Sequence, residues 1–336
     1  MKTLRKLFLC LLLCAGQFAT AQESEIDRLI NQGVELHDSG DYPGAIELYK
    51  KALELDPNSD QAHVEIGYSY YAAGDYRNSE IHSKKAIELD GEYAGLAYIN
   101  YGNALDAQGK TRKAIKVYEE GLKEHESYLL YYNHGISCMN SGKLDKAFES
   151  AVSAIDLNPM HGSSHLLLSD VMAAKNSRIQ AILPLYFFLL TENHTERAKT
   201  RFADLRKYLD HGVSKTDEGT LDVNIPVSGN SDFDAAEMMI SLLKSSEDLE
   251  ENRDKPRLQL FAENNDKIFK MLGELKKEQG GIFWELYVPF FSQLAENGHT
   301  ETYSYYIALT EGEEAVSWLD RHKEEINSFG EWVNQQ

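Results

Sequence analysis

Two histidines and an aspartate have a spacing that could bind a metal ion. His161 and His165 are four positions apart, a spacing that places two side chains on one face of a helix, and Asp170 follows closely. However, Gly162 directly follows His161 and favours a turn, so His161 should lie outside the helix. Because the spacing supplies no third ligand, we expect both histidines to have structural roles and the chain to bind no metal.

Cys138 is the second candidate for chemistry, as a nucleophile. It lies where a helix would face its neighbour, so buried packing is the expected role. The chain contains no HExxH motif, no Gly-x-Ser-x-Gly motif and no glycine-rich phosphate loop. Acidic runs such as Glu247 to Glu251 are typical of a solvated helix surface. We therefore expect a protein that is not an enzyme and that uses no cofactor. An enzyme with its site in the C-terminal region, or a metal-binding protein, is a remote alternative.

The amino-acid composition and net charge further limit the classes of partner that the chain could bind. The 336 residues are 42% hydrophobic and 26% charged, which is typical of a folded protein of about two domains. The 54 acidic residues outnumber the 34 basic ones, giving a formal net charge of −20, and no local basic patch interrupts this excess. Such a chain repels phosphate backbones, so nucleic acid is not an expected partner.

The N-terminus has the pattern of an export signal. Three cations precede the apolar run Leu7–Ala15, and Ala19-Thr20-Ala21 supplies the small residues that a signal peptidase accepts. The run is about half the length of a bilayer span, so a membrane anchor is not expected. We expect cleavage after Ala21, a periplasmic or secreted protein and a possible envelope complex. A lipoprotein attached through Cys14 is the alternative, which the bulky Leu13 before the cysteine disfavours.

An internal repeat organises the first half of the chain. Aligned on itself at a period near 34 residues, the chain shows four segments in register, beginning at Ile26, Asp60, Gly95 and Tyr128. Each segment has a small residue in its first helix and a glycine that ends this helix; these are Gly33, Gly67, Gly102 and Gly135, and Gly40, Gly74, Gly109 and Gly142. Ala45, Ala114 and Ala147 supply small residues in the second helix, so the two helices can pack closely.

These segments resemble the tetratricopeptide repeat (TPR), a helix-turn-helix unit that stacks into a solenoid. The resemblance implies an all-α fold with four clear repeats. A fifth, degenerate repeat extends from Gly162 to Thr195, with Pro184 inside its second helix. A capping helix is expected over Thr195–Leu209, because Ala198, Phe202, Leu205 and Leu209 form one apolar stripe.

The resemblance also implies a binding groove along the first helices, lined by their second, fifth, ninth, twelfth and thirteenth positions. The expected central contacts are Val64, Tyr68, Tyr71, Ile99, Asn103, Asp106, Tyr132, Ile136, Met139 and Asn140. The ninth and twelfth positions of the first repeat are Val34 and His37, and the ninth position of the fifth repeat is Asp170.

None of these groove positions is Lys or Arg, so the family's way of binding a terminal carboxylate with lysines is not expected. An apolar, tyrosine-bearing groove with a few acids suits an apolar or mildly basic segment of a protein or peptide partner. The chain's own apolar stripe from Ile282 to Leu294 is an alternative occupant. In that case the solenoid would be a self-packed spacer, and the C-terminal region would carry the binding function.

The remaining chain divides into three expected parts. We assign residues 22–212 to the solenoid, residues 213–231 to a polar linker and residues 232–336 to a C-terminal helical domain. Within the linker, Leu221, Val223, Ile225 and Val227 alternate with other residues, which predicts a short strand. The apolar stripes after residue 232 predict several helices, one of them interrupted at Pro289. These helices resemble no family that we recognise.

Overall fold

The computed structural model describes residues 25–211, 213–215, 221–223, 233–247, 249–275 and 280–336. The expected signal segment, residues 1–21, lies outside the described residues. The chain divides into two compact units, residues 1–143 and 144–336, and each is described by itself. Residues 213–231, where the sequence predicts a domain boundary, fall within the second unit, and that boundary stays a prediction.

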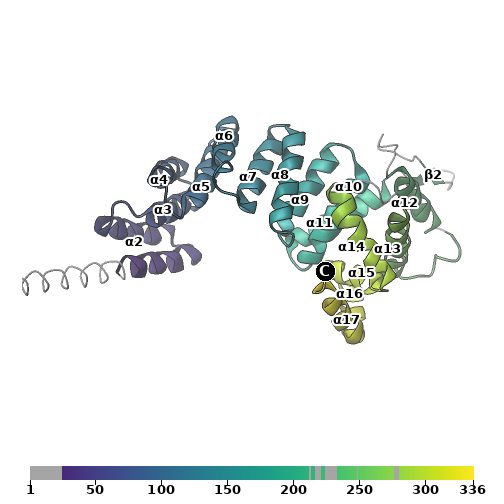
Figure 1. Cartoon of the computed structure of the whole chain (residues 1–336). Helices are drawn as coiled ribbons and strands as arrows, with labels where there is room; N and C mark the ends of the chain where they lie inside the picture. The colour runs from purple at the N-terminus through teal and green to yellow at the C-terminus, as the bar shows by residue number, and fades with distance from the viewer. Residues whose placement is uncertain (1–24, 212, 216–220, 224–232, 248, 276–279) are drawn as a thin grey trace, which may run out of the picture. The chain divides into compact units, whose positions relative to one another are not determined.

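The first unit is a series of antiparallel helix pairs (Figure 1). Residues 25–38 are helical, and the helices that follow are α2 (Tyr42–Leu55), α3 (Asp60–Ala72), α4 (Tyr76–Leu89), α5 (Ala94–Ala107), α6 (Thr111–Gly121) and α7 (Tyr128–Asn140). Each helix packs against the next, and the first helices α3, α5 and α7 also pack against one another. This is the predicted stack of repeats, and the all-α solenoid fold is confirmed.

Glycines set the geometry of each repeat. Gly40, Gly74, Gly109 and Gly142 all end a first helix at positive φ, between 74° and 87°, where an L side chain would be strained. Within the first pair, a Cβ on Gly33 would lie 2.3 Å from the ring of Tyr49. The glycine therefore lets that ring lie flat against the first helix. The buried Ala45 and Ala114 complete the close contact from the second helix.

The second unit continues with more helices and one small hairpin. Its elements are α8 (Leu144–Leu157), α9 (Gly162–Ala174), α10 (Arg178–Thr191), α11 (Glu196–Asp210), β1 (Val213–Lys215), β2 (Leu221–Val223), α12 (Asp234–Ser246), α13 (Arg257–Glu274), a π-helical turn (Phe283–Tyr287), α14 (Val288–Glu296), α15 (Thr300–Ile307), a 3-10 turn (Leu309–Glu311), α16 (Glu313–Arg321) and α17 (Lys323–Val333). The two strands pair antiparallel, with Val213 opposite Val223.

Several elements predicted from the sequence of this unit are present in the structure. The capping helix is α11, with Thr195 as its N-cap and all four stripe residues buried. A strand begins at Leu221 as predicted, whereas Ile225 and Val227 lie outside the described residues. The helix predicted around Pro289 changes from a π-helical turn to α14 just before this residue. Pro289 thus sits in the first turn of α14, where its missing N–H costs least.

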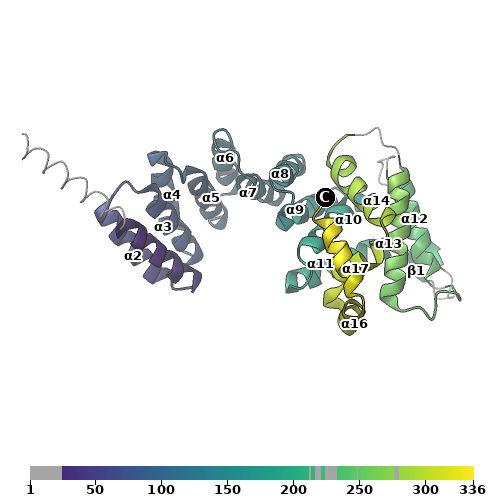
Figure 2. The same cartoon turned by 60° about the horizontal axis from the view of Figure 1, so that its bottom comes forward.

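Aromatic side chains form the core of the second unit, where helices α10 and α13 to α15 meet. Figure 2 shows α10, α13 and α14 near one another. Tyr186 contacts the rings of Phe269, Phe291 and Tyr303, with ring centroids 5.3 to 6.2 Å apart. All four residues are fully buried. The Tyr186 hydroxyl donates a 2.5 Å hydrogen bond to Asn265 Oδ1, and the Tyr303 hydroxyl donates one to the Tyr186 carbonyl. These bonds satisfy polar groups that would otherwise be costly to bury.

A buried ion pair joins the C-terminal region to the end of the repeats. Arg178, at the start of α10, donates to the Glu237 carboxylate of α12 at 2.5 Å, with both side chains less than a tenth exposed. The same guanidinium donates to the carbonyls of Tyr208, His211 and Glu237. Because its donors are shared among several acceptors, the charge can be buried here. The C-terminal helices of this unit are therefore fixed to α10 and α11.

Candidate functional site

The predicted groove residues lie on the first helices of the first unit and differ in exposure. Tyr68 is 47% exposed and Asn140 is also exposed, whereas Val64 and Ile99 are buried at 3% and 9%. The half-buried members are Tyr71, Asn103, Asp106, Tyr132, Ile136 and Met139. Val64 packs between Ala86 and Ala97, and Ile99 lies in the hydrophobic cluster of the third repeat. Thus the two aliphatic side chains support the surface instead of lining it.

We call the surface formed by His37, Tyr68, Tyr71, Asn103, Asp106, Tyr132, Ile136, Met139 and Asn140 the first-helix face. At its beginning, the rings of His37 and Tyr68 stack with centroids 4.5 Å apart, and Tyr42 meets His37 edge-on at 5.1 Å. His37 Nδ1 lies 2.8 Å from the Ser69 hydroxyl. Burial lowers the pKa of His37, so the imidazole is neutral at pH 7.

The third repeat has an equivalent contact between a polar side chain and a serine of the next first helix, but with different residues. Asp106 corresponds in register to His37, and it accepts a hydrogen bond from Ser137, which corresponds to Ser69. The hydroxyl of Tyr118 donates to Asn103 Oδ1 at 2.6 Å. A polar side chain near the end of one first helix is therefore bonded to a serine of a later one, and this contact sets how neighbouring repeats stack.

The equivalent tyrosine of the first repeat has no such acceptor. Tyr49 corresponds to Tyr118, but Val34 stands where the third repeat has Asn103. The Tyr49 side chain is fully buried, and the Ser69 side chain lies close to its hydroxyl. Burial and the nearby Glu65 carboxylate raise its pKa, so the hydroxyl stays protonated. A protonated hydroxyl and a carboxylate therefore lie close together beneath the start of the first-helix face.

Most of the positive charges of this unit lie on its second helices. Helices α3, α5 and α7 contain no Lys or Arg in 13, 14 and 13 residues. The three second helices carry Lys50 and Lys51 in α2, Arg77, Lys84 and Lys85 in α4, and Arg112, Lys113 and Lys116 in α6. Of the four first helices, α3 and α5 therefore have acids as their only Asp, Glu, Lys or Arg side chains, α7 has none of these, and the helix of residues 25–38 carries one cation, Arg28, which is paired with Glu25.

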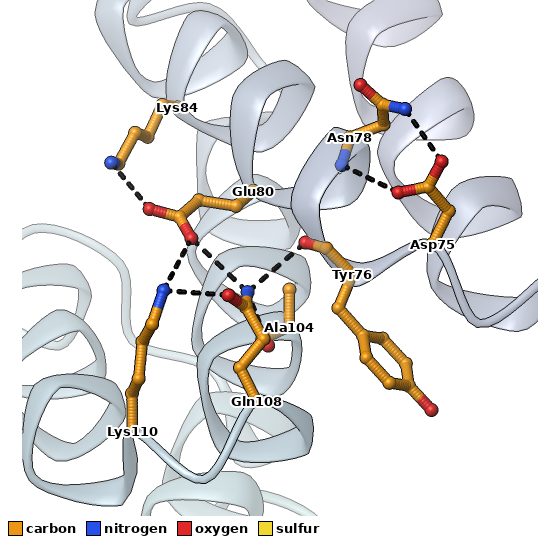
Figure 3. A network of polar contacts seen from close by, with 8 residues as sticks. All are labelled: Asp75, Tyr76, Asn78, Glu80, Lys84, Ala104, Gln108 and Lys110. Carbon is orange, nitrogen blue, oxygen red and sulfur yellow. Dashed lines mark hydrogen bonds and ion pairs between the residues drawn. The ribbon is translucent and has the colours of Figure 1, made fainter.

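Figure 3 shows how the second-helix side uses its lysines. Glu80 of α4 accepts hydrogen bonds from Lys84 at 2.8 Å and from Gln108 at 3.2 Å, and it pairs with Lys110 at 3.4 Å. Burial acts to raise the pKa of Glu80, but hydrogen bonds from Lys84 and Gln108 outweigh it and lower the pKa. The same Gln108 amide donates to the carbonyl of Tyr76. These lysines therefore serve contacts within and between helices of this unit.

The other candidates for chemistry have structural partners. His165 is fully buried, with Nδ1 2.6 Å from the Tyr287 hydroxyl and Nε2 2.8 Å from the Pro159 carbonyl. His161 contacts the Ser164 hydroxyl at 2.7 Å, before α9 begins. Cys138 is buried in α7, as predicted, with its sulfur 3.4 Å from His134 Nε2. In the described part of the chain, no group of three or more His, Cys, Asp or Glu side chains is arranged to hold a metal ion.

The stripe from Ile282 to Leu294 packs inside the second unit. Phe283 contacts the ring of Phe148 in α8, while Tyr287 and Phe290 contact Phe187 in α10. As for a membrane, none of the helices in the described residues is both long and apolar enough to span one.

Some features of the site were not predicted from the sequence. The rings of Tyr42 and Tyr76 lie beside predicted contacts, with Tyr76 5.6 Å from Tyr71. Both rings belong to the first residue of a second helix, which the groove positions of the resemblance do not include. Ser69 and Ser137 occupy the tenth position of their repeats. Their recurrence two repeats apart is the signal in the sequence that could have revealed the serine contacts.

Comparisons with known proteins support the repeat assignment. Family models described as "TPR repeat" and "Tetratricopeptide repeat" match residues 33–74, 60–93 and 100–160. A small glutamine-rich tetratricopeptide repeat-containing protein of Mycosarcoma maydis is 29% identical over 100 residues, covering 30% of this chain and 28% of the relative. A TPR repeat-containing protein of Methanocaldococcus jannaschii is 27% identical over 168 residues, covering 47% of this chain and 30% of the relative.

The chain spans less than a third of the length of these curated relatives. Among solved structures, that of Pseudomonas aeruginosa PilF is 21% identical, with a TM-score of 0.51, and the match covers 56% of this chain and 86% of PilF. At this level of identity the likeness concerns the fold alone.

Proposed function

Because residues 33–160 belong to the tetratricopeptide repeat family, we propose that this chain is a scaffold that binds a segment of another protein through its first-helix face. Proteins of this family bind protein or peptide partners. The proposal places the central contacts at Tyr68, Tyr71 and Asn103, continuing along α7 to Tyr132 and Met139.

The observation that supports this proposal is a run of tyrosines that folding leaves partly uncovered. On α3, Tyr68 is 47% exposed and Tyr71 is half-buried, and on α7 Tyr132 is half-buried. Tyrosine offers a large, rigid contact area with only two side-chain torsions, so little entropy is lost when a partner covers it. His37 and Tyr76 already hold the rings of Tyr68 and Tyr71 by ring contacts. The face is therefore partly preorganised for binding.

The test is selection of binding peptides from a random display library on the purified chain, followed by a counter-screen. The variant carrying Tyr68→Ala and Tyr132→Ala should lose most of the selected peptides. Tyr70→Ala is the matched control, because Tyr70 lies on α3 beneath Lys50 and outside the first-helix face. Circular dichroism would show that all variants are folded. Selected peptides that bind wild type and the double variant equally would overturn the proposed surface.

We further propose that the scaffold acts outside the cytoplasm, in the periplasm or as a secreted protein. The support is the pattern at residues 1–21, with its cations, apolar run and Ala19-Thr20-Ala21 junction. Expression of the full chain in a Gram-negative host should yield a product that begins at Gln22 in the periplasmic fraction. N-terminal sequencing and mass measurement would check this. A product lipidated at Cys14, or an uncleaved cytoplasmic chain, would contradict the proposed route.

A second candidate function places binding in the C-terminal region. The observation that favours it is an exposed apolar stripe on α12, where Met238 is 50% and Leu242 54% exposed. These side chains are one helical turn apart and share a face. If this stripe carries the binding, Met238→Ser with Leu242→Ser should abolish selection of peptides while Tyr68→Ala has no effect.

A further inference from the structure

We propose that the first-helix face selects cationic segments, in which lysine or arginine side chains alternate with apolar ones. This inference rests on the proposed function, because it specifies the partner of the same surface. Three features of the first unit support it: the absence of Lys and Arg from α3, α5 and α7 and, within the described residues, carboxylates without a cationic partner and tyrosine rings with no cation over them.

The distribution of charge is strongly asymmetric. Lys and Arg make up 34 of the 336 residues, so the 40 residues of α3, α5 and α7 would hold about four at that rate, yet they hold none. The second helices α2, α4 and α6 hold eight in 39 residues, and the first helix of the first repeat, residues 25–38, holds one, Arg28, which is paired with Glu25. A partner that approaches α3, α5 and α7 therefore meets acids and no Lys or Arg of these helices. Electrostatic complementarity of this kind favours a positively charged partner and disfavours an anionic one.

Acids at the start of the face lack a cationic partner. Glu65 of α3 is half-buried, and burial together with the neighbouring Asp38 raises its pKa. Neither carboxylate forms an ion pair within the described residues. The second unit shows the contrasting case: Asp170, a groove position of the fifth repeat, accepts two 2.8 Å hydrogen bonds from Arg201 of α11. The chain thus neutralises one such acid itself and leaves Glu65 for a cation from outside.

The aromatic rings of the first unit also differ in whether a cation of the chain itself lies over them. On the second-helix side, the chain's own lysines lie over tyrosine rings: Lys50 is 5.7 Å from the ring centre of Tyr70, and Lys84 is 4.9 Å from that of Tyr101. In the described residues, no Lys or Arg lies over the ring of Tyr68 or Tyr71. A partner's lysine or arginine could occupy the equivalent place, where a cation gains from the ring quadrupole and from the nearby carboxylates.

Asp106 extends the acidic surface to the third repeat. Its carboxylate accepts a hydrogen bond from the Ser137 hydroxyl, which is neutral, so the negative charge remains available. Asp106 also contributes to raising the pKa of Tyr71, after burial and Tyr76, which places its charge near that ring. Asp106 near Tyr71, together with Glu65 of the same helix as Tyr68, matches a segment with more than one cationic side chain.

The experiment compares dodecapeptides with blocked ends that alternate a test residue with leucine and serine. The test residue is lysine, arginine, glutamine or glutamate, and binding to the full purified chain is measured by calorimetry and fluorescence anisotropy. We expect the lysine and arginine peptides to bind at least about tenfold more tightly than the glutamine peptide, with affinity falling as salt rises. The glutamate peptide should not bind.

Variants assign the effect to the face. Glu65→Gln with Asp106→Asn should weaken binding of the cationic peptides about tenfold and leave the glutamine peptide unchanged. The matched control is Glu54→Gln with Glu88→Gln, which removes two exposed acids from the second helices α2 and α4 and should change nothing. If the control weakens binding equally, the attraction comes from net charge alone and the inference is wrong.

Two further outcomes separate this inference from the proposed function. If display selection yields peptides that require Tyr68 and Tyr132 but are not enriched in lysine or arginine, the surface is right and the cationic specificity is wrong. If the selected peptides are insensitive to both tyrosines, the proposed function itself fails. Cationic peptides that depend on Glu65, Asp106 and the two tyrosines would support both.

Discussion

The first-helix face and the core of the second unit use tyrosine in opposite ways. In the second unit, Tyr186, Tyr287 and Tyr303 are fully buried, and each hydroxyl forms a hydrogen bond inside the core. On the first-helix face, Tyr68 and Tyr71 stay partly uncovered on α3, which contains no Lys or Arg, although Tyr49 and Tyr118 of the same unit are fully buried. The role of a tyrosine in this protein therefore depends on the residues packed around it and not on its residue type. These neighbours determine whether the ring is buried in a core or exposed on a surface.

The largest expected effect that follows from this comparison is on stability. Tyr303→Ala should lower the free energy of unfolding by about 3–5 kcal/mol, because it leaves a cavity between Tyr186, Phe269 and Phe291 and removes a buried hydrogen bond. Tyr68→Ala should cost less than about 1 kcal/mol, since this ring is nearly half exposed. Chemical denaturation of both variants would measure the difference.

The control is Tyr303→Phe, which keeps the ring and removes only the hydroxyl. It should cost about 1–3 kcal/mol, because the Tyr186 carbonyl loses its buried donor. If Tyr68→Ala destabilises the protein as much as Tyr303→Ala, then Tyr68 is a packing residue and the contrast between the two units is wrong.

The first unit could be predicted from the sequence because its determinants are local. The glycines that end each first helix lie at fixed spacing, and the structure places all four at positive φ. The second unit is determined by contacts that no spacing reveals: Arg178 pairs with Glu237 across 59 positions, and His165 meets Tyr287 across 122. The helices there could be predicted from their apolar stripes, but not which stripes face one another.

The candidate surface was predicted only in part for a related reason. Groove positions transferred from the repeat pattern include Val64 and Ile99, which the structure buries. Their exposure depends on the residues opposite them, such as Ala97 against Val64 and Val117 near Ile99, and not on their own register. Conversely, the uncompensated Glu65 is not a groove position, and its importance depends on the absence of a cation nearby.

The second expected effect is a dependence of the stability of the second unit on pH, caused by a buried histidine in its core. Burial lowers the pKa of His165 to about 4, whereas it is near 6.5 in an unfolded chain. The neutral imidazole therefore stabilises the folded state fully above pH 6.5, and this contribution is lost as pH falls toward 4. The loss should reach about 3 kcal/mol, measurable as a fall in the unfolding midpoint between pH 7 and pH 4.

His165→Gln tests the origin of this dependence, because glutamine does not titrate. The variant should be less stable at pH 7 but should show a flatter dependence on pH. His82 in the first unit provides a matched comparison, since burial followed by the charge of His63 also lowers its pKa to about 4. Its smaller burial predicts a smaller effect for His82→Gln. An unchanged slope in both variants would mean that carboxylates, and not buried histidines, control the acid sensitivity.

The smallest expected effect tests whether the first unit is held by local contacts. The Asp75 carboxylate caps α4 by accepting from the Asn78 N–H at 3.1 Å, and it also accepts from the Asn78 side chain at 2.7 Å (Figure 3). Asp75→Ala should therefore cost about 1 kcal/mol and increase hydrogen exchange mainly in the first turn of α4. Asp75→Asn keeps an acceptor and should cost less. Because repeats interact chiefly with their neighbours, the change should stay within the adjoining helices α3 and α5, whereas Tyr303→Ala should weaken its whole unit. Protection lost evenly across α2 to α7 would instead show that the first unit unfolds as one block, and that its stability depends on long-range packing as much as that of the second.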